Sequence, residues 1–201
     1  TLSLQDAVPI SNPTEASGPR DGRHKFELVQ FVHLDDAPRF GELQIIASMQ
    51  PSHILSDMRW APALLGPARY PEAYPFASML KHSPVLAFGT DYPVEPINPF
   101  RGLYAAVTRE SEEGGPRGGW VPEEKISLEE AIRASTWGSA VAEFEEQRKG
   151  TLAPGKLADL IVLSQALTRL PPREILRTQV LLTMVGGKIV YDRLRDEPPG
   201  K

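Results

Sequence analysis

Residues 44–53 read QIIASMQPSH, an apolar stretch that stops at a glutamine and a proline and leads into a histidine. Residues 85–91 repeat this pattern as VLAFGTD, where a short apolar run ends at a Gly-Thr pair and an aspartate. A third candidate strand covers residues 24–29. Short runs that are apolar on both faces, separated by helix-compatible stretches such as 74–82, are typical of a parallel sheet covered on both sides. The sequence therefore predicts an α/β fold.

Two features follow the predicted strands. Residues 93–122 are rich in turn-forming residues and predict a long irregular region, which in a compact domain is usually a functional loop. Ser127 and Glu130 match the capping box, in which each side chain bonds to the backbone N–H of the other residue. A helix is therefore expected to begin there and to run, with one interruption, to about Arg148.

The last part of the chain is expected to be β structure. Residues 158–163 predict a strand, and Gly186-Gly187 is a strong signal for a two-residue hairpin turn between strands at 180–185 and 188–191. The expected organisation is a loop-rich N-terminal segment (1–22), an α/β part (23–149), a small β part (150–192) and a tail (193–201).

Composition narrows the classes of protein to which the chain can belong. The 201 residues are 41% hydrophobic and 24% charged, as in a folded globular protein. The formal net charge of −4 offers no basic excess for nucleic acid or for an anionic membrane surface. Cysteine is absent, which excludes disulfides, thiolate metal sites and a cysteine nucleophile.

The sequence shows no targeting segment. It has no signal peptide and no apolar run of membrane-spanning length, so a cytoplasmic location is expected. It begins Thr1-Leu2-Ser3 without a methionine, from which we expect a piece of a longer chain.

Two predicted strand ends carry candidate metal ligands. His53 follows the strand at 44–49, and Asp91 follows the strand at 85–88. Because the carboxyl ends of parallel strands meet at one edge of a sheet, the two side chains are expected there together. An imidazole and a carboxylate suit Zn²⁺ or a similar divalent ion. Spacing alone leaves the ordinary alternatives open, which are a surface histidine and an Asx-turn or helix N-cap at Asp91.

Three more residues are candidates for contact with a substrate. Arg69 is suited to pairing with an anionic group, although a solvated salt bridge within its loop is the common alternative. Trp60 and Trp120 suit the wall of an apolar pocket or a place in the core. The sequence contains no P-loop, G-x-S-x-G, H-E-x-x-H or dinucleotide fingerprint.

Several motifs in series resemble the amidohydrolase superfamily, and most closely amidohydrolase family 3, whose members include enzymes like N-substituted formamide deformylase. They run in order from about residue 22 to residue 192. The motifs are ASMQPSH (47–53), AFGTDYPV (87–94), LYAAVTR (103–109), GGWVP (118–122), KGTLAPGKLAD (149–159) and VGGKIVY (185–191). The resemblance implies the C-terminal half of a (β/α)8 barrel, strands five to eight, in residues 23–149, followed by strands of a small β-sandwich in 150–192.

The same resemblance implies metal-dependent hydrolysis of an amide-type C–N bond in a small molecule, in which a metal-bound water attacks the carbonyl. His53 matches the metal ligand at the end of strand six. Asp91 matches the strand-eight aspartate, which binds the metal and takes the proton from the water. The expected cofactor is a divalent metal, zinc before others, and Arg69 and Trp120 remain the candidates for binding substrate.

The chain departs from the family pattern in its ligands. The His-x-His pair of strand one and the ligand of strand four have no counterpart, and Leu28 replaces the histidine of the strand-five motif. His24 lies on the same strand face about 13 Å away, and His33 comes later in a loop. We therefore expect an incomplete chain, with a complementary N-terminal half or a second copy as partner and with no nucleic acid or membrane partner. The alternative is a non-catalytic relative that acts only through folding or partner binding.

Overall fold

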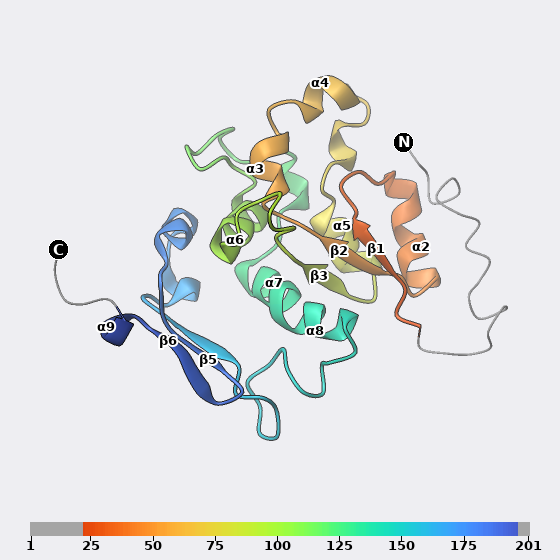
Figure 1. The fold of residues 1–201 in the computed structure, drawn as a ribbon. Helices are drawn as coiled ribbons and strands as arrows, with labels where there is room; N and C mark the ends of the chain where they lie inside the picture. The colour runs from red at the N-terminus through yellow and green to blue at the C-terminus, as the bar shows by residue number, and fades with distance from the viewer. Residues whose placement is uncertain (1–21, 197–201) are drawn as a thin grey trace.

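The computed structural model describes residues 22–196, so residues 1–21 of the expected N-terminal segment and the last five residues of the expected tail lie outside the described part. Two sheets organise the chain (Figure 1). The first consists of β1 (Lys25–Leu28), β2 (Ile46–Met49) and β3 (Leu86–Phe88), and the second consists of β4 (Leu160–Leu163), β5 (Val180–Val185) and β6 (Lys188–Asp192). The first sheet is parallel and the second is antiparallel, so the expected α/β class is confirmed.

Helices surround the first sheet, with α2 beside β1 and the α7–α8 region beside β3 (Figure 1). The α-helices are α2 (Ala37–Glu42), α3 (His53–Asp57), α4 (Ala61–Leu65), α5 (Phe76–His82), α6 (Pro99–Thr108), α7 (Leu128–Arg133), α8 (Ser139–Ala142) and α9 (Arg193–Asp196). The short 3-10 helices are η1 (Leu34–Asp36), η2 (Tyr70–Glu72), η3 (Pro122–Glu124), η5 (Leu167–Arg169) and η6 (Pro172–Arg177), and η4 (Ala134–Gly138) is a π-helical turn. None of the helices formed by residues 22–196 is long and apolar enough to span a bilayer.

Strands β2 and β3 are buried on both faces, as their apolar residues predict, whereas β1 at the edge of the sheet is mostly exposed. Ala47 and Met49 of β2 point into the main core. Ile46, their neighbour on the opposite face, joins Ala87 of β3 and Val141 of α8 in a second cluster. This alternation places helices on both sides of the sheet and leaves the strand ends as the place where polar side chains gather.

The strand count differs from the expectation. Residues 23–149 were expected to hold strands five to eight of a barrel, with His53 on strand six and Asp91 on strand eight. The described residues form three parallel strands in the order β1-β2-β3, and Ala47 of β2 pairs directly with Leu86 of β3. The numbering five, six and eight is therefore wrong, because consecutive barrel strands are neighbours and no strand separates β2 from β3 here.

Helix α6 lies inside the region expected to be irregular. Asn98 caps it, accepting a hydrogen bond from the Phe100 N–H at 3.0 Å. Pro99 occupies the first turn, where a helix needs no N–H donor. Leu103 and Tyr104 are buried and fix the helix to the core. Pro99 and Gly102 lie within the helix and the other prolines and glycines of this region flank it, which is why the sequence suggested turns here.

The helix after the capping box begins as expected and ends early. The Ser127 hydroxyl accepts from the Glu130 N–H at 3.2 Å, and the Glu130 carboxylate accepts from the Ser127 N–H at 2.7 Å. The helical segment ends at Ala142 instead of near Arg148. Phe144 has a φ of +61°, which takes the backbone out of the helical region directly after that end.

The second sheet contains the expected hairpin. Gly186 and Gly187 join β5 to β6 with φ values of +55° and +78°. A two-residue turn of this kind requires positive φ at both positions, which glycine adopts without strain. Ile161 and Val190 of this sheet are about half exposed, so part of its apolar surface is uncovered in the described residues.

Candidate functional site

The two residues expected to act together lie at the carboxyl ends of neighbouring strands. His53 begins α3, and its N–H donates to the Gln50 carbonyl directly after β2. Gly89, which follows β3, donates its N–H to the carbonyl of Met49 at 3.0 Å. This bond keeps the two strand ends together and brings Asp91, two residues farther along, to the same edge of the sheet.

The structure places the two side chains against each other. His53 Nε2 lies 3.5 Å from Asp91 Oδ2. The His53 side chain is 8% exposed and the Asp91 side chain is 41% exposed. His53 Nε2 is a buried nitrogen without a hydrogen-bond partner among the described residues. The pair therefore combines a held imidazole with a carboxylate that a small molecule can reach.

Three further side chains hold the imidazole. Gln30 Nε2 lies 3.0 Å from His53 Nδ1, and the same amide group donates to the Tyr74 hydroxyl oxygen at 3.1 Å. The Tyr74 hydroxyl donates in turn to the carboxylate of Asp57. Burial and the contact with Asp57 raise the pKa of Tyr74 well above its ordinary value, so its hydroxyl keeps its proton at neutral pH.

Backbone pairing brings Gln30 to Tyr74. The segment after β1 lies antiparallel to residues 72–74, with Tyr74 N–H donating to the Gln30 carbonyl at 2.7 Å and Val32 N–H donating to the Glu72 carbonyl at 3.2 Å. Asp57 lies four residues after His53 on α3, which puts both on one face of that short helix. That spacing was visible in the sequence. Gln30 and Tyr74 carried no such signal, because their contact depends on tertiary structure.

Arg109 is the buried support of this arrangement. It lies in the left-handed region with a φ of +54° at the end of α6, and its side chain is fully buried. The guanidinium donates to the carbonyls of Tyr74 at 2.8 Å, Ala73 at 2.9 Å and Trp120. Burial lowers the pKa of Arg109 to about 10, so the group stays charged at neutral pH. In the sequence, Arg109 stands out only as the last residue of the motif LYAAVTR (103–109), and nothing there indicates its buried role.

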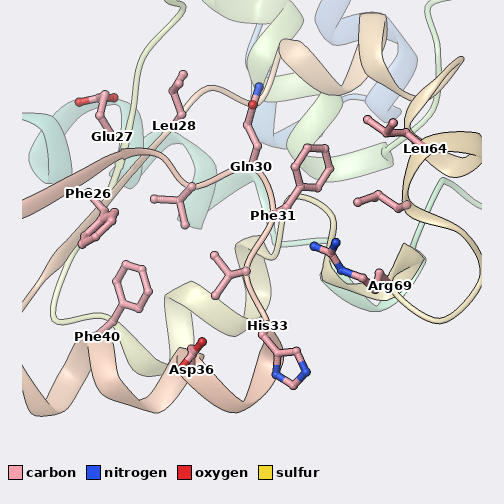
Figure 2. A pocket seen from close by; sticks show the side chains of 13 residues that line it. Phe26, Glu27, Leu28, Gln30, Phe31, His33, Asp36, Phe40, Leu64 and Arg69 are labelled. Carbon is pink, nitrogen blue, oxygen red and sulfur yellow. The ribbon is translucent and has the colours of Figure 1, made fainter. Parts of the chain in front are cut away.

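A cavity of about 580 Å³ is lined in part by Gln30, the residue that contacts His53 (Figure 2). Residues from Phe26 to His33 line one side, and Leu64 and Arg69 line the other. Gln30 contacts both the cavity and His53, whereas His53 and Asp91 themselves are outside its lining. Arg69 thus lines a cavity, and it also forms the loop ion pair that was the common alternative for it.

The partner in that ion pair is Glu72. Arg69 Nε lies 3.0 Å from Glu72 Oε2, and the Glu72 side chain is buried. His33 Nε2 approaches the other Glu72 oxygen at 3.7 Å. The Arg69 guanidinium that lines the cavity is therefore already paired with a carboxylate.

Trp120 lies in the core. Its side chain is 2% exposed and meets the rings of Tyr70 and Tyr74 at centroid distances of 5.7 and 6.0 Å. It is not among the residues that line the cavity beside Arg69. The expected contact of Trp120 with a substrate is therefore not seen, since the indole fills core volume behind Tyr74. Trp60, by contrast, is exposed.

The expected zinc site is incomplete. Within residues 22–196, no three His, Cys, Asp or Glu side chains are grouped so that they could hold a metal ion. Leu28, at the end of β1, is 39% exposed and offers no donor atom. A zinc site needs at least three protein ligands. His53 and Asp91 supply two at most, so the described residues do not fit this metal by themselves.

The chain is similar to proteins of one kind along most of its length. The profile of the amidohydrolase family matches residues 6–191. The chain is 39% identical over 177 residues to Protein LONG AFTER FAR-RED 3 of Arabidopsis thaliana, which covers 88% of this chain and 30% of that protein. It is 31% identical over 188 residues to the putative amidohydrolase YtcJ of Bacillus subtilis (strain 168), covering 92% and 35%.

A third relative is the N-substituted formamide deformylase of Arthrobacter pascens, at 31% identity over 120 residues, which is 60% of this chain and 22% of that protein. The chain thus spans about a third or less of the length of these relatives. Among solved structures, an uncharacterized metal-dependent hydrolase from Pyrococcus horikoshii OT3 superimposes with a TM-score of 0.68 at 28% identity, covering 79% of this chain and 32% of that one.

Proposed function

The chain belongs to the amidohydrolase family, and we propose that it supplies the C-terminal part of a hydrolase that cleaves an amide-type C–N bond in a small molecule. The observation that carries the proposal is the contact of 3.5 Å between His53 and Asp91 at neighbouring strand ends. The similarity to an N-substituted formamide deformylase supports the bond type.

In this proposal the parallel sheet is the last part of a (β/α)8 barrel. If β3 is the eighth strand, its direct neighbour β2 is the seventh and β1 is the sixth. The sheet β4–β6 is then one layer of a small β-sandwich, which accounts for the half-exposed apolar residues on it. Active sites of such barrels lie at the carboxyl ends of the strands, where His53 and Asp91 are found.

Asp91 is the proposed proton acceptor. As a water molecule attacks the carbonyl carbon, its proton passes to the Asp91 carboxylate. The same proton then goes to the departing nitrogen as the C–N bond breaks, so that a carboxylic acid and an amine leave. The exposure of Asp91 gives a substrate access to this carboxylate. General base catalysis of this kind contributes about 10²–10⁴-fold to a rate.

The remaining parts of the proposal concern metal and substrate. A divalent metal, with zinc the first expectation, needs donors beyond the described residues, and no step above depends on it. Arg69 is proposed to bind an anionic group of the substrate in the cavity that it lines. A complementary N-terminal part is the proposed partner, because the chain covers 35% or less of the curated relatives.

A chimaera tests the proposed function. This chain replaces the matching segment of the Arthrobacter pascens deformylase, and amine release is measured from a panel of N-substituted formamides and other small amides. We expect turnover by the chimaera and none by this chain alone, because the chain alone lacks part of the site. The parental deformylase is the control. Turnover by this chain alone would contradict its assignment as a partial site.

The second candidate is a non-catalytic relative that acts through folding or partner binding. The observation that favours it is Leu28, which stands where the family pattern has a ligand histidine and leaves the end of β1 without a donor. This candidate predicts a chimaera that folds and melts cooperatively yet releases no amine. The same experiment therefore separates the two.

A further inference from the structure

A series of hydrogen-bonded side chains ends at His53 and determines which nitrogen of its imidazole carries the proton. Asp57 accepts from the Tyr74 hydroxyl, the Tyr74 oxygen accepts from the Gln30 amide, and that amide group lies 3.0 Å from His53 Nδ1. His53 and Asp57 start and end the same short helix, α3. The side chains of Asp57, Tyr74, Gln30 and His53 therefore form one continuous series of contacts.

The donor and the acceptor of each hydrogen bond in this series follow from the protons that each group carries. A carboxylate only accepts, and the single hydroxyl proton of Tyr74 is directed at Asp57. The Tyr74 oxygen must then accept from Gln30, so the NH₂ side of the Gln30 amide faces it at 3.1 Å. Turning the amide over would set two acceptor oxygens against each other with no proton between them.

The same NH₂ group faces His53. Since it donates, His53 Nδ1 accepts, and a neutral imidazole carries its one proton on the other nitrogen. That nitrogen is Nε2, which is buried and without a hydrogen-bond partner among the described residues, with Asp91 Oδ2 at 3.5 Å. The proton is therefore on the ring nitrogen that lies nearer the Asp91 carboxylate.

A histidine that binds a metal through Nε2 requires the opposite arrangement. Its Nε2 lone pair must be free, and its Nδ1–H is donated to a carbonyl or a carboxylate. Here the group at Nδ1 is a donor. The expectation that His53 is a metal ligand therefore disagrees with the way this chain holds the ring. The proposed strand order, in which β2 is the seventh strand, also removes the match of His53 to the ligand of strand six.

We infer that His53 is a positioning residue, fixed by Gln30 with its proton on Nε2, and that it orients the Asp91 carboxylate instead of binding a metal. The effect of His53 on turnover rests on the proposed function, in which Asp91 must be held toward the reacting water. The tautomer itself depends only on the contacts described above. A spectrum of the resting chain can therefore test it without a substrate.

The test is a two-bond ¹H–¹⁵N correlation spectrum of the chain labelled at its four histidines, recorded above neutral pH. The His53 signals are identified by their loss in His53→Gln. We expect the pattern of an Nε2-protonated ring at His53. An Nδ1-protonated ring in the unsubstituted chain would overturn the inference, whether or not the chimaera releases amine.

A substitution at Gln30 exchanges donor and acceptor in the hydrogen bond at His53 Nδ1. Gln30→Glu places an acceptor there, so we expect the proton to move to Nδ1 and the affinity for Zn²⁺, measured by calorimetry with the metal alone, to rise by about tenfold or more. Gln44→Glu is the matched control, since it adds the same charge on an exposed residue away from His53.

Tyr74→Phe, which frees Gln30 to turn over, should weaken the preference for one tautomer. Equal tautomer populations in Tyr74→Phe and the unsubstituted chain would contradict the role given to this series of contacts.

Discussion

Asp91→Asn is expected to lower kcat of the deformylase chimaera by about 10²–10⁴-fold, with a much smaller change in KM. The amide keeps the size and shape of the side chain but cannot accept the proton of the attacking water. Asp91 makes no other side-chain hydrogen bond or ion pair among the described residues than the contact with His53. The substitution should therefore leave the melting temperature nearly unchanged. Amine release at saturating substrate measures the effect.

Two variants complete this experiment. Asp35→Asn is the matched control, because the Asp35 side chain is almost fully exposed and lies outside the site. It should leave kcat unchanged. Asp91→Glu keeps the carboxylate and moves it by one methylene, so we expect an intermediate loss. If Asp91→Asn retains full kcat, the proton acceptor is another group and the proposed role of Asp91 is wrong.

Arg109→Met is expected to lower the free energy of unfolding by about 3–5 kcal/mol, which is a large part of the stability of an ordinary domain. The guanidinium donates to three carbonyls, those of Ala73, Tyr74 and Trp120, and the Arg109 side chain is fully buried. Methionine fills much of the volume but leaves the Ala73 and Trp120 oxygens without a donor, while the Tyr74 oxygen keeps the Phe76 N–H. Urea unfolding, followed by tryptophan fluorescence, measures the loss.

Arg148→Met is the control for this substitution. The Arg148 side chain is 65% exposed and pairs with Glu145 on the surface, where an ion pair contributes about 0–1 kcal/mol. We expect little change there. Arg109→Lys keeps the charge but cannot reach three carbonyls in one plane, so it should fall between the two. A loss for Arg109→Met no larger than that for Arg148→Met would show that the buried guanidinium does not hold residues 73–74.

The fold could be predicted from the sequence where local signals are strong. The apolar runs at β2 and β3, the capping box at Ser127 and the glycine pair at Gly186 each indicate their structure within a few residues. Helix α6 was missed because prolines and glycines surround it. The predicted strand numbering was wrong because pairing between strands depends on tertiary structure. The sequence of β2 alone does not indicate that β3 lies beside it.

The candidate site divides in the same way. His53 and Asp91 could be placed together because each directly follows an apolar strand of one parallel sheet. The expectation of a zinc ligand at His53 depended on residue type, on its place after a strand and on the resemblance to the family motif. What decides the matter is the group at Nδ1, and Gln30 reaches it only through the backbone pairing with Tyr74. Sequence spacing between residues 30, 53 and 74 carries no sign of that contact.

The zinc content of the purified chain tests the central claim most directly, which is that these residues hold a proton-transfer pair and an incomplete metal site. The chain is dialysed against metal-free neutral buffer and its zinc is measured by atomic absorption, beside His53→Gln. The account predicts far less than one zinc per chain in both proteins. A content of about one zinc per chain that is lost in His53→Gln would contradict it.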